Sequence, residues 1–332
     1  MKPNISKVCI DLKTFHNLPS SQFLLIRIML AMSSSNNLQL IIFSQHGMMD
    51  GNKDMKALAC KVTPPRSLVI APELGYLATF FDIHPLINQV ERNAKQTLQQ
   101  YPDLPARIIA TSLGGVIWVE VLSRHPEWWS RFESLVLLGS PIGGADRARI
   151  VDPFGWGIGI AKDLGKNRRE LAEQIAARIP TLVIAGNTDG GGDGTVTLES
   201  TKLKHAYFVC LQNVSHVALK TDRAVIRAIR EFWSQPRQPL PEPEHNLMSR
   251  LIDHFRAVPG ITDANANDFV HAKTVFSFSG GVSLRTWKNP VGVKHIFIAN
   301  QQGTCDYAGF VGWVHTDGLN RAIEQAIQNF GS

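Results

Sequence analysis

The chain has 332 residues, of which 44% are hydrophobic and 19% charged, a composition typical of a globular protein with a large core. Its formal net charge is +6, but the lysines and arginines are spread along the chain, so we expect no nucleic-acid partner. The four cysteines lie far apart with no Cys-x-x-Cys pair, which argues against a zinc site and a disulfide scaffold. We therefore expect reduced thiols and a cytoplasmic protein.

The first apolar segment, residues 23–32, is too short to span a bilayer and contains Arg27. We interpret it as an early strand or a buried helix, with a membrane-contact segment as the alternative. Because the chain carries a small excess of positive charge, weak contact with an anionic membrane surface also stays open.

Short apolar runs rich in β-branched residues alternate with helical patterns through the first two thirds of the chain. The runs have the length and composition of buried parallel strands. They are residues 38–43, 67–70, 106–109, 134–138, 181–185 and 206–211. Helical periodicity follows at 86–100, 116–122 and 222–233. This alternation predicts an α/β fold, a mostly parallel sheet flanked by helices.

A long connection, residues 145–179, separates two of these strands. Its first half places apolar side chains, including Phe154 and Trp156, between glycines, a pattern that suits a mobile cap over an acyl pocket. The alternative is a buried helix whose start contains glycines. Phe80 and Phe81 form a second candidate wall of the pocket.

Proline-rich residues 235–244 end the α/β region, and we expect them to be an extended linker. We therefore divide the chain into a domain at 1–234, the linker, and a small α+β domain at 245–332. In the latter we expect a helix at 247–257, strands at 274–279, 282–287 and 294–300, and an amphipathic last helix. No residue spacing there indicates chemistry, so we expect it to pack against the first domain, to mediate oligomerisation or to bind a protein partner.

Ser112 lies where the strand at 106–109 gives way to a helix, between the small residues Ala110 and Gly114. A tight strand-to-helix turn that exposes a nucleophilic serine requires small residues two positions before and after it. The helix that follows directs backbone N–H groups at any anion formed there. Ser112 is therefore the candidate nucleophile.

A loop with His46 and Met48 follows the strand at 38–43. Acyl transfer requires two backbone N–H donors for the oxyanion, and we expect them from Leu113, after the nucleophile, and from Met48. His46 is a candidate pocket residue. The alternative is an ordinary His-Gly turn without a catalytic role.

Two aspartates compete as the acid that orients the base, Asp189 and Asp193, both in a glycine-rich loop after the strand at 181–185. We favour Asp193, which begins an Asp-Gly-Thr-Val turn. A calcium site is the rival interpretation, but two carboxylates are too few for a full oxygen cage.

His216 follows the strand at 206–211 and can reach the carboxyl edge of the sheet, where it would act as general base and then general acid. The chain order Ser112, Asp193, His216 is the order found with a nucleophile elbow on an open α/β sheet. The alternative for any single histidine is a surface or packed side chain.

Together these segments give residues 35–234 a resemblance to the α/β-hydrolase fold family. It rests on His46-Gly47, on the elbow at 110–114, on the Gly-Ser-Pro-Ile-Gly-Gly loop at 139–144, on the Asp193 turn and on Ser215-His216. The sequence departs from the usual pattern at Ala110, where alanine resembles some small bacterial lipases. The C-terminal domain lies outside the resemblance.

The resemblance implies a lipase- or esterase-like serine hydrolase that cleaves an acyl ester or thioester, possible lipids included, with no cofactor and no metal. Two alternatives stay open. One is an acyltransferase with the same triad, in which an alcohol replaces water. The other is a non-catalytic binding or scaffold protein with the hydrolase fold.

Overall fold

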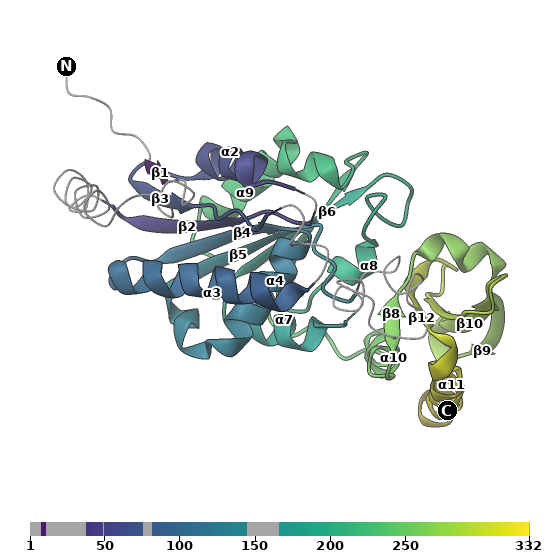
Figure 1. The fold of residues 1–332 in the computed structure, drawn as a ribbon. Coiled ribbons are helices and arrows are strands. Elements are labelled where there is room, and N and C mark those ends of the chain that lie inside the picture. The colour runs from purple at the N-terminus through teal and green to yellow at the C-terminus, as the bar shows by residue number, and fades with distance from the viewer. Residues whose placement is uncertain (1–7, 11–37, 49, 76–81, 145–165, 332) are drawn as a thin grey trace, which may run out of the picture.

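The computed structural model of the chain describes residues 8–10, 38–48, 50–75, 82–144 and 166–331 (Figure 1). These residues form two sheets, one of seven strands in the order β1-β3-β2-β4-β5-β6-β7 and one of five in the order β8-β12-β11-β10-β9. The apolar segment at 23–32 lies outside the described residues.

The seven-stranded sheet is parallel at every pairing, as the sequence predicts. Its strands are β1 (Val8–Ile10), β2 (Leu40–Gln45), β3 (Ser67–Ile70), β4 (Ala106–Thr111), β5 (Phe132–Leu138), β6 (Thr181–Asn187) and β7 (Ala206–Gln212). Strands β2 and β3 are buried along their whole length, which is why they read as continuous apolar runs rather than as alternating ones.

Helices cover both faces of this sheet (Figure 1). On one face lie α2 (Asn52–Val62) and α9 (Arg223–Trp233), and on the other α3 (Ile83–Gln100), α4 (Leu113–Arg124) and α7 (Arg169–Ala176). The short helix α8 (Leu198–Thr201) follows β6. The confirmed fold class is therefore α/β with a helix-flanked parallel sheet.

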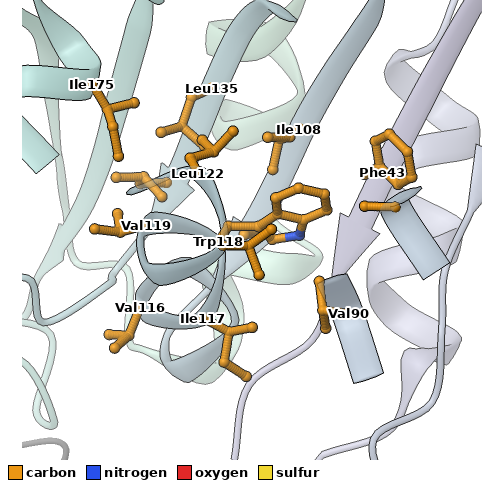
Figure 2. Close-up of a cluster of buried hydrophobic side chains, with 14 of the residues drawn as sticks. Phe43, Val90, Ile108, Val116, Ile117, Trp118, Val119, Leu122, Leu135 and Ile175 are labelled. Carbon is orange, nitrogen blue, oxygen red and sulfur yellow. The ribbon is translucent and has the colours of Figure 1, made fainter. Parts of the chain in front are cut away.

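The core between α4 and the sheet centres on Trp118, whose indole ring lies 5.1 Å from the ring of Phe43 (Figure 2). Val90 of α3 and Ile108 of β4 lie in the same cluster. Burying a large aromatic or aliphatic side chain stabilises a fold by about 1.5–3 kcal/mol. This packing fixes α4, and with it the residue from which α4 starts.

The second sheet is antiparallel and, with two helices, forms the small α+β domain that the sequence predicts. Its elements are α10 (Leu247–Arg256), β8 (Ile261–Asp263), β9 (Lys273–Ser277), β10 (Ser283–Lys288), β11 (Lys294–Ala299), β12 (Cys305–Val311) and α11 (Thr316–Phe330). It has its own hydrophobic core, built on Leu251, Phe255, Leu284 and Leu319. Short 3-10 helices occur at Pro126–Arg131, Val217–Lys220, Ala266–His271, Ser279–Gly281 and Trp313–His315.

The second sheet lies beside α8, beyond the carboxyl ends of the parallel strands (Figure 1). A buried ion pair joins the two parts, from Arg169 at the start of α7 to Asp263 at the end of β8. Asp263 Oδ2 also lies close to Gly143, in the loop after β5. The two are so close that a Cβ added to this glycine would collide with the carboxylate oxygen. The C-terminal part therefore contacts a loop at the edge of the parallel sheet.

One sequence-based expectation is wrong: Cys60, in α2, is disulfide-bonded, whereas we expected reduced cysteines. Cys210 and Cys305 are free thiols. The expectation of a cytoplasmic protein loses the support it took from reduced thiols. Among the residues described, no helix has the length and apolar composition that would let it cross a membrane.

Candidate functional site

Ser112 occupies the corner between β4 and α4, with φ 53° and ψ −126°. A positive φ is unfavourable for a residue with a Cβ, and such strain is common at functional sites. The conformation is held from both sides, because the Ser112 N–H donates to the carbonyl of Leu138 and the Ser112 carbonyl accepts from Gly115. The serine is thus presented at the carboxyl edge of the sheet.

Two glycines let the loop after β2 pack against this corner. A Cβ on Gly47 would lie 2.8 Å from Ser112 Cβ, and one on Gly114 would lie 2.6 Å from the His46 carbonyl oxygen. Neither position has room for a larger residue. The small residue required two positions after the serine is therefore explained by the close approach of the His46-Gly47 backbone.

The acid and the base predicted from the sequence are in contact. His216 Nδ1 and Asp193 Oδ2 are 2.7 Å apart. The backbone N–H of His216 also donates to the backbone carbonyl of Asp193. The other carboxylate oxygen, Oδ1, accepts from the N–H groups of Thr195 and Val196. The Asp193 side chain is only 2% exposed, so its charge is held by hydrogen bonds rather than by water.

Asp189, the competing aspartate, makes hydrogen bonds within its own loop. Its Oδ1 accepts from the N–H groups of Gly191 and Gly192, which closes its own loop, and its side chain is exposed. Of the two aspartates, only Asp193 contacts His216.

The end of β5 brings the serine and the Asp193–His216 pair to one place. Leu138 accepts from the Ser112 N–H, and the next residue, Gly139, lies against the pair. A Cβ on Gly139 would be 3.0 Å from Asp193 Oδ2 and 3.1 Å from His216 Nδ1. No hydrogen bond joins Ser112 Oγ to His216 within the described residues. Catalytic hydrogen bonds are often longer without substrate, so this arrangement is compatible with a triad.

The two residues expected to donate to the oxyanion both belong to segments next to Ser112. Leu113 is the first residue of α4, so its N–H has no acceptor within the helix. Met48 follows Gly47, whose Cα approaches Ser112, and its side chain packs against the core. The loop after β2 and the start of α4 thus both lie next to the serine.

His46, the candidate pocket residue, has a fully buried ring that braces this loop. Its Nε2 accepts from the Leu74 N–H at 3.0 Å, and its Nδ1 is 2.9 Å from the Gly47 carbonyl oxygen. These contacts fit a neutral ring with the proton on Nδ1. Burial lowers the pKa of His46, against the opposing effects of the Gly47 carbonyl and the Glu73 carboxylate.

An ion pair connects the loop after β2 to the segment after His216. Lys220 Nζ donates to Asp50 Oδ2 at 2.7 Å, with the two side chains 13% and 21% exposed. Asp50 lies two residues beyond Met48, and Lys220 lies four beyond His216. No residue spacing in the sequence indicates this pair, because its members are 170 residues apart.

The aromatic pocket residues Phe80, Phe81, Phe154 and Trp156 lie outside the described residues. Of the expected cap, residues 166–179 are described, and there α7 contributes Ala172 and Ile175 to the core. Within the described ranges, no group of three or more histidine, cysteine or acidic side chains is placed to hold a metal ion.

No family model matches the chain, and no curated protein matches it. Solved structures similar to it include the mature lipase BlEst2 of Bacillus licheniformis, at 18% identity and TM-score 0.44, over 59% of this chain and 91% of that one. The lin2722 product of Listeria innocua is 12% identical, with TM-score 0.45, over 63% and 100% of the two chains. BlEst2 in its propeptide form is 12% identical, with TM-score 0.47, over 84% and 76%.

The architecture itself is that of the α/β-hydrolase fold. The parallel sheet carries a serine at the β4–α4 corner, an aspartate after β6 and a histidine after β7. The fold that the sequence resemblance implies is thus confirmed.

Proposed function

We propose that this protein is a serine hydrolase that cleaves a carboxylic ester or thioester through Ser112, His216 and Asp193. The observation that supports it most is the 2.7 Å contact between His216 Nδ1 and Asp193 Oδ2, beside the strained corner that presents Ser112. Strain at a serine and a buried acid–histidine pair are costly features that a merely structural loop does not need.

In the proposed reaction, Ser112 Oγ attacks the acyl carbon while His216 Nε2 takes the hydroxyl proton. The Asp193 carboxylate accepts a hydrogen bond from the His216 Nδ1–H and stabilises the imidazolium. The N–H groups of Leu113 and Met48 stabilise the oxyanion. The tetrahedral intermediate expels the alcohol or thiol, which takes the proton from His216, and leaves an acyl-Ser112 ester. Water, activated by His216, then hydrolyses that ester and restores the serine.

For the substrate we propose an acyl ester with an apolar chain, on the sequence pattern of Phe80, Phe81, Phe154 and Trp156. We further propose that residues 1–234 are the catalytic domain, with a cap within 145–179, and that 245–332 form a separate domain after the linker. Contact of the enzyme with a lipid surface belongs to the same proposal, since such substrates gather there.

The test is covalent labelling with a fluorophosphonate, followed by hydrolysis of p-nitrophenyl esters of increasing chain length. Wild type is expected to label and Ser112→Ala is not, and turnover is expected to rise from acetyl to medium-chain esters. Failure of folded wild type to label would favour a scaffold protein. Labelling with faster acyl transfer to an added alcohol than to water would favour an acyltransferase.

A further inference from the structure

A cavity of about 500 Å³ lies in the C-terminal domain, where the β10–β11 hairpin meets the start of α11. Its charged lining residues are Lys273 of β9, Lys288 of β10 and Lys294 of β11, and no carboxylate is among the lining residues. We call it the basic pocket. Its volume is within the range of small-molecule sites, about 300–1,000 Å³.

The sheet register forces the lysines of the basic pocket together. Lys288 and Lys294 are directly opposite each other in the antiparallel pair, and Lys273 is paired with Thr286 on the same sheet. Like charges directly opposite each other destabilise a sheet. Repulsion from Lys288 adds to burial in lowering the pKa of Lys294. The fold thus retains an unfavourable cluster of positive charge.

No protein carboxylate relieves this repulsion. Within the described part of the chain, none of the three ammonium groups takes part in an ion pair. Lys294 Nζ donates instead to the neutral Asn320 Oδ1 of α11. Asp317, which follows Thr316 in the first turn of α11, is exposed and does not line the pocket. A bound anion would supply the missing negative charge.

One further feature extends the basic pocket beyond a lysine cluster. Thr316, the first residue of the 15-residue α11, is part of the lining, and the start of a helix carries partial positive charge. Trp287 also borders the pocket, but side chains alternate along β10, so its ring lies on the other face of the sheet from Lys288, 5.1 Å from the His295 ring.

We propose that the basic pocket binds a small molecule that carries a multiply charged phosphate group. Lysine ammonium groups are compact point charges suited to phosphate oxygens, and three of them with a helix start match such a group. This binding is separate from the proposed reaction at Ser112.

Isothermal titration of the full chain with inorganic pyrophosphate and with adenosine diphosphate, at about 150 mM salt to screen non-specific attraction, tests the proposal. Both are expected to bind, because each carries a diphosphate group. Lys288→Gln is expected to weaken both at least tenfold. The matched control Lys95→Gln removes an exposed lysine of α3 and is expected to change neither.

A second measurement separates binding from structure. Because Lys288→Gln removes like-charge repulsion, it is expected to raise the Tm of the unliganded protein while it lowers affinity. No binding of either probe, or equal weakening by Lys95→Gln, would overturn the proposal. Ester hydrolysis by Lys288→Gln is expected to equal that of wild type, so the result is independent of the proposed reaction.

Discussion

At the corner occupied by Ser112, the backbone conformation is unfavourable by itself, at a cost of order 1–3 kcal/mol. The surroundings impose it, because the Ser112 N–H is bonded to Leu138 and the following helix is fixed by buried Trp118. The unfavourable φ keeps the side chain out of the helix and at the sheet edge. The same tightness explains why glycine stands where other backbone segments approach.

Gly47 offers the sharpest test of that close approach. An added methyl group would lie 2.8 Å from Ser112 Cβ and 3.2 Å from the Thr111 carbonyl oxygen, so the loop must move. Gly47→Ala is therefore expected to reduce kcat for ester hydrolysis about a hundredfold, since a displacement of about 1 Å can cost that much.

Gly51→Ala is the matched control in the same loop. Its added methyl group would meet nothing nearer than Glu73 Oε2 at 3.5 Å, an ordinary contact. We expect activity close to that of wild type. Equal kcat values for Gly47→Ala and wild type would contradict the assigned position of the loop.

His46 makes stability depend on pH. Its pKa is lowered by burial below the ordinary value of 6.5, so the folded state binds this proton less readily than the unfolded chain. The neutral ring stabilises the fold fully above pH 6.5. As pH falls below 6.5, the unfolded chain takes up the proton first, and the free energy of unfolding decreases.

Urea unfolding at pH 5 and pH 8 measures this effect. We expect a smaller loss of stability between the two pH values in His46→Gln than in wild type. The exposed His84→Gln serves as control and is expected to keep the wild-type loss. An unchanged loss in His46→Gln would show that another group is responsible.

Single residues could be predicted from sequence only where chain order carries information. Ser112, Asp193 and His216 each follow a recognisable strand, and parallel strands bring their carboxyl ends to one edge. The Asp-Gly-Thr-Val turn favoured Asp193 over Asp189 but left both open, because both lie in one glycine-rich loop; the structure adds that the Asp193 carboxylate contacts His216.

At the scale of elements, the buried strands were predictable and the less regular ones were not. β12 was missed because Gly309 interrupts its apolar pattern, and glycine weakens a strand. The structure requires glycine there, since a Cβ would lie 2.7 Å from the Tyr307 hydroxyl oxygen. α2 was not predicted, although its buried residues have helical spacing: Met55, Leu58, Ala59 and Val62.

The ion pair between Asp50 and Lys220 links the loop after β2 to the segment after His216. In the proposed reaction we expect it to act as a positioning contact, since neither side chain is assigned to the reacting atoms. Lys220→Gln is expected to lower kcat about tenfold, because small displacements of reacting groups are costly, with little change in KM. Stability is expected to fall by less than about 1 kcal/mol, as for other partly exposed pairs.

The exchange Asp50→Lys with Lys220→Asp restores opposite charges and is expected to recover part of the lost kcat. Lys53→Gln removes an exposed lysine from the same region and is expected to have no effect. A drop in Tm without a drop in kcat would show that the pair is structural only.

At the scale of the whole molecule, the two sheets are not independent. Asp263, from the second sheet, lies against Gly143, and Asn265 approaches Gly191 in the loop that leads to Asp193. Composition shifts at the prolines indicated a second domain, but no sequence pattern indicated that it contacts loops of the candidate active site. Such contacts between distant segments leave no periodic signal.

We therefore expect the buried pair of Arg169 and Asp263 to couple stability to the proposed activity. Its side chains are 6% and 2% exposed, so Asp263→Asn leaves a buried guanidinium without its charge partner, at a cost of about 3–5 kcal/mol. We expect a large fall in Tm, and below that Tm a reduced rate of ester hydrolysis, because the loops at Gly143 and Gly191 lose their support.

Lys204→Gln is the matched control, because it removes a more exposed contact between the same two parts. Lys204 and Asp253 are 25% and 36% exposed, and such pairs contribute about 0–1 kcal/mol. Calorimetry and p-nitrophenyl ester hydrolysis measure both variants. If Asp263→Asn unfolded at lower temperature yet kept the wild-type rate below its Tm, the second sheet would stabilise the fold without shaping the site.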